Sequence, residues 1–375
     1  MKKKRRLLGI VFPLAFVAVL TFIAITLIFG QGQGFSGLTG LFGNRSAAEP
    51  AGEYHFDVGR NRVFANLGGS LAAAGSLGIQ VLDNSDTETL RDLFRLSSPA
   101  IKAAEEWAIA FDIGGTAVRA FTEKRVSASL EAGGAIVSAT INKNGWFVVC
   151  TQESKAFKSI VTAYDSSGRE VYKISLATGY ALSAVLSPDN RKLAVLNLTD
   201  DGSKITLYSL NSEAPDSEYN YEDGLILEIR NLPDGIILAV ATDSLIIVDA
   251  DGVGTVFFGF DGSRLGGYML GEDFITLHLL DYGVGYRGRI VTLDDAGRLL
   301  GGIVTDREVI SMSSGGGYLA ILKSDGSMFF DAELNQFQPV EESTTIAGAT
   351  QVISLGDRLV FAAGDHFAVV FRIGA

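Results

Sequence analysis

Asn144-Gly145-Trp146-Phe147-Val148-Val149-Cys150 is a tight turn followed by an apolar strand, and this element returns along the chain. It occurs eight times, at steps of 37 to 45 residues with a mean of about 41. A period of this length predicts an array of small repeated units. The other copies are Gly68-Gly69 before Ser70–Ala74, Glu105-Glu106 before Trp107–Phe111, Asp189–Arg191 before Lys192–Leu196, Asp234-Gly235 before Ile236–Val240, Glu272-Asp273 before Phe274–His278, Gly316-Gly317 before Tyr318–Leu322, and Gly356-Asp357 before Arg358–Ala362.

A second element lies between these copies. It is a strand, a four-residue turn that begins with Asp and ends with Gly, and another strand, as in 160–174, 245–258 and 290–304. Asp at the first position and Gly at the last suit a type I turn with a left-handed exit. Each unit therefore holds about four short strands, and such units at this period are typical of propeller blades. A possible short helix around Asp86–Phe94 is the exception.

The two ends of the repeat region predict a closed ring. The final unit supplies three strands, Gln351–Leu355, Arg358–Ala362 and Phe367–Ile373, while Tyr54–Val58 is a spare alternating strand before the first full unit. Pairing the spare strand with the incomplete blade would close the ring and cover an exposed sheet edge. We expect an all-β fold, an eight-bladed β-propeller over residues 53–375, with seven blades as the alternative.

The first thirty residues carry a separate signal. Lys2–Arg6 places five positive charges before Leu7–Phe29, an apolar run without charged residues, His, Asn or Gln. At about 1.5 Å per residue, a helix over this run spans a hydrocarbon core about 30 Å thick. Basic residues before the span keep the N-terminus in the cytoplasm. A cleaved signal peptide, the alternative, would have a shorter apolar region of about 7–15 residues.

These signals predict a single-pass protein of the cell membrane. We assign residues 1–6 to a cytoplasmic basic tail, 7–29 to the transmembrane helix that anchors the chain, and 30–52 to a Gly-rich linker. The propeller at 53–375 would then lie outside the cytoplasm. Without the five basic residues of the tail, 26 Lys and Arg face 43 Asp and Glu, a net charge near −17. Such an acidic domain disfavours binding to nucleic acid or to anionic lipid headgroups.

Several motifs in the propeller region look functional in isolation. Ala110–Arg119 resembles the first phosphate loop of sugar kinases, but no alternating strand and helix pattern follows it, so we interpret it as a hairpin turn. Asp249–Gly252 begins like a calcium loop but lacks the later oxygen ligands. His55, His278 and His366 have no partner four residues away, which disfavours zinc, and no Gly-x-Ser-x-Gly elbow is present. We therefore assign no catalytic, cofactor or metal residue and expect no cofactor.

The lone cysteine, Cys150, lies in an apolar run, so we predict a small buried side chain rather than a reactive thiol. His278 also lies within an apolar strand and is expected to be a core histidine whose hydrogen bonds are satisfied. Trp107 and Trp146 each begin the second strand of a unit and are expected to pack between blades.

Two segments resemble known propeller repeats. Leu186–Val195, with its Ser-Pro-Asp-Asn turn, is similar to an element of WD40-like and TolB-like propellers, and Ala163–Tyr172 is similar to a quinoprotein-like repeat. The whole layout resembles a family of unknown function, the membrane-anchored propellers of Gram-positive bacteria. The resemblance implies a propeller on a membrane anchor and brings no active site with it.

We expect a binding or scaffold protein that presents a broad loop face to an extracytoplasmic protein partner, with no nucleic acid bound and the oligomeric state open. The alternative is a propeller that binds a small ligand, a sugar or a cation in its central funnel and that could be an enzyme. That alternative requires acidic residues from several blades to converge in the funnel, with candidates at Asp200, Asp201, Asp281 and Asp294.

Overall fold

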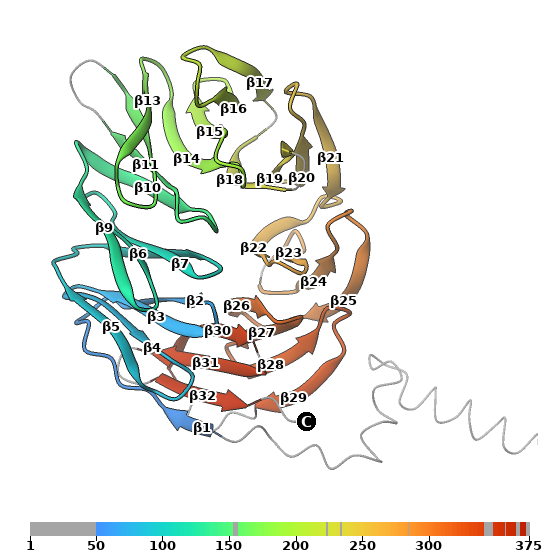
Figure 1. Ribbon diagram of the computed structural model, residues 1–375. Helices are drawn as coiled ribbons and strands as arrows, with labels where there is room; N and C mark the ends of the chain where they lie inside the picture. Colours follow the sequence, from blue (N-terminus) through green and yellow to red (C-terminus); the bar gives the residue numbers. More distant parts are fainter. Residues whose placement is uncertain are drawn as a thin grey trace, which may run out of the picture. The chain divides into compact units, whose positions relative to one another are not determined.

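The computed structural model describes residues 50–152, 157–222, 224–232, 235–283, 285–340, 348–356, 358–364 and 368–372. Their regular elements are 32 strands, which form eight four-stranded antiparallel sheets. Figure 1 shows these sheets arranged as blades around a common centre. The eight-bladed propeller predicted from the repeat is therefore confirmed, and the seven-bladed alternative is wrong.

In each blade the strands are named A to D from the innermost to the outermost. The first four blades are formed by β2 (Val63–Leu67), β3 (Ser70–Gly75), β4 (Gly78–Leu82) and β5 (Glu88–Leu93); β6 (Pro99–Ala104), β7 (Trp107–Asp112), β8 (Ala117–Thr122) and β9 (Arg125–Glu131); β10 (Ala135–Ile141), β11 (Phe147–Gln152), β12 (Ser159–Tyr164) and β13 (Glu170–Leu176); and β14 (Tyr180–Leu186), β15 (Lys192–Thr199), β16 (Gly202–Ser209) and β17 (Pro215–Tyr221).

The other four blades follow the same plan, except that the eighth takes its strand D from the start of the propeller. They are formed by β18 (Ile226–Asn231), β19 (Ile237–Ala241), β20 (Ser244–Val248) and β21 (Gly254–Gly259); β22 (Arg264–Leu270), β23 (Ile275–Leu280), β24 (Gly288–Leu293) and β25 (Leu299–Thr305); β26 (Val309–Gly315), β27 (Tyr318–Lys323), β28 (Gly326–Asp331) and β29 (Gln336–Val340); and β30 (Ala349–Gly356), β31 (Leu359–Gly364), β32 (Ala368–Arg372) and β1 (Pro50–Glu53).

The repeated turn-and-strand elements of the sequence are the B strands. These strands are apolar almost throughout because each has a neighbouring strand on both sides and a neighbouring blade over both faces, and β3, β23 and β31 are buried along their whole length. Strand D has solvent at its outer edge, and its residues alternate between exposed and half-buried, as in β13. The repeated apolar runs of the sequence therefore mark the middle of each blade.

The core is divided among clusters that lie between neighbouring blades. One such cluster joins Val148 and Cys150 of the third blade to Ala184 and Val195 of the fourth. The predicted packing of Trp107 between blades is confirmed, since its ring lies against Gly145 of the next blade. Gly145 has φ +78°, and a Cβ there would stand 2.6 Å from the indole, so both the turn and the ring require glycine.

The ring closes where β1 pairs antiparallel with β32. The spare strand was predicted at Tyr54–Val58, which is wrong by a few residues, because the closing strand is Pro50–Glu53, inside the range assigned to the linker. After Tyr54, whose backbone N–H donates to the carbonyl of Ala368 at 2.8 Å, the chain leaves the sheet.

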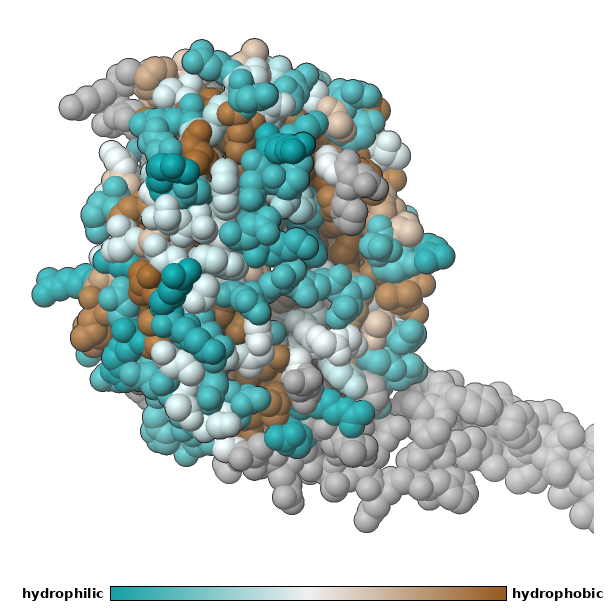
Figure 2. Space-filling model, viewed as in Figure 1, coloured by the Kyte–Doolittle hydropathy of each residue, from teal (hydrophilic) through white to brown (hydrophobic). Residues whose placement is uncertain are grey.

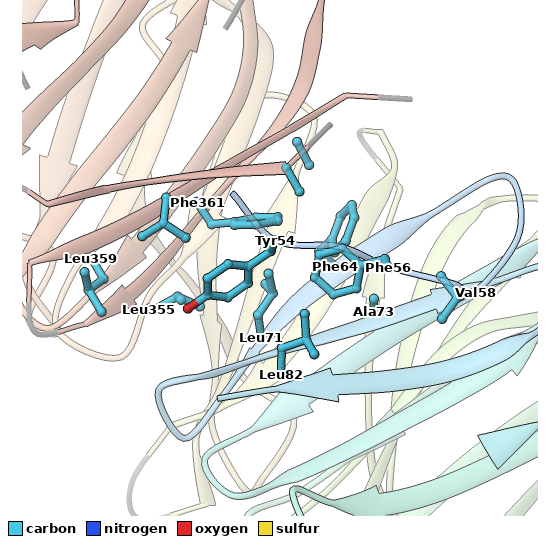
Figure 3. Close-up of a cluster of buried hydrophobic side chains, with 13 residues drawn as sticks. Tyr54, Phe56, Val58, Phe64, Leu71, Ala73, Leu82, Leu355, Leu359 and Phe361 are labelled. Atoms are coloured by element: carbon cyan, nitrogen blue, oxygen red, sulfur yellow. The ribbon is translucent and has the colours of Figure 1, made fainter. Parts of the chain in front are cut away.

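The predicted strand instead lies in the seam between the last and first blades. Figure 3 shows Tyr54 and Phe56 in this seam, beside Phe64 of β2 and Phe361 of β31. Alternation in the sequence identified the buried side of this segment correctly. The alternation did not predict the strand pairing correctly. A segment can alternate between buried and exposed residues without pairing in a sheet, when its buried side chains fill the space between two blades. One of its backbone groups, the N–H of Asp57, is satisfied by the Gln80 side chain at 2.9 Å instead.

The short helix predicted around Asp86–Phe94 is also wrong, because this segment contains strand β5. Asp86 has φ +60°, which is in the left-handed region, so this residue belongs to the turn before β5 and cannot begin a right-handed helix. Leu90 and Phe94 lie on the inner side and pack on the core cluster shared with the second blade. The outermost strand of a blade is mostly polar and has a few apolar residues on one side only. Its sequence can therefore be mistaken for that of an amphipathic helix.

No helix in the described part of the chain has the length and apolar character of a membrane span. The predicted tail and span, residues 1–29, lie outside the described residues.

Candidate functional site

The two faces of the propeller differ in the connections that they carry. Because neighbouring strands of a blade are antiparallel, the links from A to B and from C to D lie on one face, which we call the AB/CD face. The links from B to C, and from D to the next A, lie on the opposite face, the BC/DA face. The connection in which a loop residue lies therefore determines on which face of the propeller it is found.

Aspartates close many of the C-to-D turns on the AB/CD face. Asp249 Oδ1 accepts the backbone N–H groups of Asp251 and Val253 at 3.0 and 2.9 Å. The same Asx pattern is made in other blades by Asp83, Asp165 and Asp294, and Asp331 accepts the backbone N–H four residues on. The carboxylates thus satisfy backbone donors of their own turns. The Asp249–Gly252 segment is a turn, as its sequence predicted.

A cavity of about 350 Å³ occupies the central channel at the AB/CD face. Its walls come from the C-terminal ends of the innermost strands of five consecutive blades, the second to the sixth, and from the A-to-B turns that follow them. Three basic and three acidic side chains line it beside apolar ones. They are Lys102, Lys143 and Arg230, and Glu105, Glu228 and Glu272.

A charged contact crosses this channel. Lys102 Nζ of β6 lies 3.3 Å from Glu228 Oε1 of β18, which joins the second blade to the fifth. The other oxygen of Glu228 accepts the Tyr268 hydroxyl from β22 at 2.9 Å. Burial, and then the negative charge of Glu228, raise the pKa of Tyr268 well above its usual range, so this phenol stays protonated as a donor. Lys102 and Tyr268 together thus satisfy one carboxylate within the channel.

Arg230, two residues further along β18, has a different environment. Its guanidinium donates one hydrogen bond, 2.5 Å long, to the carbonyl oxygen of Gly271. No ion pair among the described residues includes it, although Lys102 and Lys143 are each paired with a glutamate. Burial lowers the pKa of Arg230, and the nearby charges of Glu272 and Glu228 oppose that shift. Within the described part of the chain, one hydrogen bond uses one of the five N–H donors of this half-buried guanidinium, so the group is suited to binding an anionic group.

The asparagines around this cavity are used by the fold. The Asn142 side-chain N–H donates to Asn190 Oδ1 at 2.6 Å, and Asn144 donates to the carbonyl of Pro188 at 2.6 Å. Asn231 reaches back to the carbonyl of Leu186 at 2.7 Å. These bonds link neighbouring blades to one another around the cavity.

The acidic candidates for the funnel do not converge. Asp200, Asp201 and Asp281 lie in B-to-C connections, whereas Asp294 lies in a C-to-D turn on the opposite face. Asp294 binds the backbone of its own turn, and hydrogen bonds from Arg298 lower its pKa. Asp281 forms an exposed pair with Arg287 at 3.5 Å. Among the described residues, no group of three His, Cys, Asp or Glu side chains is arranged to hold a metal ion.

Other residues singled out in the sequence are structural or isolated. The sugar-kinase-like segment forms the β7–β8 hairpin, in which buried Asp112 accepts the backbone N–H groups of Ser97 and Ser98 at 2.8 and 2.6 Å. Cys150 is buried, as predicted, and burial raises the pKa of its thiol to about 12.

Two of the three histidines fall within the described residues, and His366 lies outside them. His55 is exposed. His278 is buried in β23, as predicted, and burial lowers its pKa. The expectation of satisfied hydrogen bonds is wrong, because its Nε2 has no hydrogen-bond partner among the residues that the structure describes.

Exposed large apolar side chains gather on the BC/DA face. Among the described residues, eleven lie in its connections or at the strand ends beside them, against two at the AB/CD end and one, Val256, in mid-strand. The most exposed is Tyr282, at 81%, which shares a long B-to-C loop of the sixth blade with Tyr286. Figure 2 shows one side of the molecule, on which hydrophilic side chains surround separate hydrophobic patches. The eleven are Leu77, Leu93, Ile113, Phe157, Tyr180, Leu225, Leu227, Tyr282, Tyr286, Val304 and Ile310.

The sheet topology defines the chain as an eight-bladed β-propeller, and its fold is similar to that of solved WD40 domains and of BamB. The model of a family described as "Family of unknown function (DUF5711)" matches residues 49–258, and the chain belongs to that family. None of the curated proteins matches the sequence. The membrane anchor and the Gram-positive origin implied by the sequence resemblance stay predictions.

Three solved propellers illustrate the structural similarity. The C-terminal WD40 domain of Sif2 has a TM-score of 0.64 at 14% identity, covering 89% of this chain and 100% of that one. The WD40 domain of SCAP from fission yeast has a TM-score of 0.55 at 13% identity, covering 87% and 98%. BamB from Moraxella catarrhalis has a TM-score of 0.53 at 14% identity, covering 87% and 99%. At these identities the similarity concerns the fold alone.

Sequence reasoning missed the residues of the channel cavity, although a signal for them exists. Strands A line the central channel, and a charge in this confined space is costly unless it is paired. Lys102 interrupts Pro99–Ala104, and Glu228 and Arg230 interrupt Ile226–Asn231. A search for charged residues in the first strand of each unit would have found all three.

Proposed function

We propose that this chain is a membrane-tethered propeller that binds a protein partner outside the cytoplasm through its BC/DA face. The observation that carries the proposal is the concentration of exposed apolar side chains on that face. Single exposed apolar residues are ordinary, but their gathering on one face of a disc is typical of an interaction surface.

The loop at 281–287 supports a protein as the partner. Tyrosine is enriched at protein interfaces because its ring buries a large apolar area while its hydroxyl keeps a hydrogen bond. Tyr282 and Tyr286 stand on a loop that also contains Gly283 and Gly285, a composition shared with antibody loops that bind proteins.

The entry point of the chain is compatible with this orientation. Pro50 pairs with Phe371 near the end of β32, which places the start of β1 at the AB/CD face. The segment that comes from the predicted anchor therefore joins the propeller at the end of β1 remote from the BC/DA face. A tether on that side leaves the BC/DA face free for a partner.

Site-specific photo-crosslinking in the producing cell tests the proposal. A photoreactive phenylalanine analogue replaces Tyr282 in one full-length variant and Val253, an exposed residue on the AB/CD face, in the matched control. We expect a discrete crosslinked protein from position 282, and we expect that it weakens when Tyr286→Ser is added. Equal crosslinking from both positions, or none from position 282, would contradict the assignment of the face.

A further inference from the structure

The channel cavity contains a basic group, Arg230, that forms no ion pair within the described residues. Lys102 is paired with Glu228 at 3.3 Å, and Lys143 lies 3.8 Å from Glu105. Arg230 is the third cation of the cavity, and its one described hydrogen bond goes to a neutral carbonyl oxygen. A guanidinium has five N–H donors in a planar fork that matches a carboxylate in two parallel bonds. The remaining donors of Arg230 are therefore available to a ligand in the cavity.

A second group completes the charge pattern. Glu272 follows β22, lines the same cavity and takes part in no ion pair or hydrogen bond of the described residues. Its charge acts on Arg230, but the two side chains form no ion pair within the described set. An unpaired cation and an unpaired anion thus share one wall of the cavity. This arrangement can bind a ligand that carries both charges.

The charges in and around the cavity favour a zwitterion over a simple anion as its ligand. Its three bases and three acids cancel, so a ligand without net charge enters without an uncompensated charge. Beyond the basic tail the chain carries 26 Lys and Arg against 43 Asp and Glu, and this acidic field repels an anion that carries a carboxylate alone. A zwitterion experiences no such net repulsion.

The rest of the wall sets the size and polarity of the ligand. Trp146, Leu186 and Leu270 line the cavity with apolar surface from three blades. A volume of about 350 Å³ is near the lower end of the usual range for ligand sites, about 300–1,000 Å³. The space therefore suits a small ligand with an apolar part.

We propose that this cavity binds a free α-amino acid with an apolar side chain. Its carboxylate would be held by Arg230, its ammonium by Glu272, and its side chain would lie against Trp146 and its apolar neighbours. This site lies at the AB/CD face and is independent of the protein-binding face proposed above. Either proposal can fail without the other.

Calorimetric titration of the full-length chain in detergent, with L-leucine and L-phenylalanine as probes, tests the proposal. N-acetyl-L-leucine keeps the carboxylate alone, L-leucine amide keeps the ammonium alone, and glucose tests a sugar. We expect saturable binding of at least one amino acid, and affinity weaker by about ten- to a hundredfold for its two singly charged derivatives. No binding of either amino acid overturns the proposal, as does equal binding of a derivative or of glucose.

Variants then locate the site. Arg230→Gln should lower the affinity by at least about tenfold, and Glu272→Gln should lower it for the amino acid but not for N-acetyl-L-leucine. Arg298→Gln is the matched control, because Arg298 lies on the same face and is already paired with Asp294 at 2.7 Å. Glu272 is exposed, so its variant is expected to fold even if the Arg230 variant does not. Unchanged affinity in the Glu272 variant overturns the assignment.

Discussion

The aromatic seam that closes the ring allows a quantitative test by replacement of Phe361. This side chain is fully buried, and its ring lies 5.7, 5.9 and 5.4 Å from those of Tyr54, Phe56 and Phe64. Replacing a buried phenylalanine with alanine costs about 3–5 kcal/mol, because apolar contacts are lost and a cavity remains. We expect Phe361→Ala to lower the free energy of unfolding by an amount in this range.

Urea unfolding of the full-length chain measures this change. Trp107 and Trp146, the chain's two tryptophans, both lie in the propeller, so intrinsic fluorescence reports on this domain. Hydrogen exchange adds a local readout, because a weakened seam should expose the amides of β1 before those of β11. A loss below about 0.5 kcal/mol, the range typical of surface sites, would refute the idea that this seam closes the ring.

A double-mutant cycle separates ring contacts from simple burial. Phe56→Leu and Phe361→Leu keep most of the apolar volume but remove the edge contact between two rings at 80°. We expect a coupling energy of about 0.5–1.5 kcal/mol for this pair. Phe147→Leu, in the third blade, is the matched control and should be additive with Phe361→Leu within about 0.5 kcal/mol. If the effects of Phe56→Leu and Phe361→Leu on the free energy of unfolding are also additive, the contact between these two rings contributes nothing beyond burial.

Three further outcomes follow from single residues. Asp112→Ala should lower the free energy of unfolding by about 1–3 kcal/mol in the same urea assay, because two backbone N–H groups lose their acceptor; a neutral result would contradict this role. Cys150, whose pKa is raised to about 12 by burial, should react with Ellman's reagent at pH 8 only after unfolding, so rapid labelling of the native chain would show an open site. A hydrogen bond from Arg91 lowers the pKa of Glu88, so its stabilising contribution is present above the unfolded pKa of about 4.3 and is lost as the pH falls through the lower folded value. The stability difference between the native chain and Glu88→Gln should therefore shrink below about pH 4, and a difference constant from pH 6 to pH 3 would contradict the pairing.

The candidate site shows where sequence patterns stop being informative. Glu228 and Lys102 are 126 residues apart, and nothing in their spacing indicates that they touch. The second and fifth blades face each other across one channel. The distance between their side chains is fixed only when the ring of blades is closed. Conversely, Asp200 and Asp294 looked equivalent in the sequence, yet strand direction places them on opposite faces of the propeller.

The sequence by itself determined the repeat and the B strand of each blade, and it favoured eight blades over seven. These properties are local, because a strand covered by a neighbouring strand on each side and by a blade on each face must be apolar, and a tight turn must use residues that suit it. Tertiary structure alone decided how the ring closes, since Pro50–Glu53 has no feature that marks it as a strand until β32 is beside it. It also decided which charges meet in the channel, because contacts between distant blades depend on the geometry of the whole ring and leave no periodic trace in the chain.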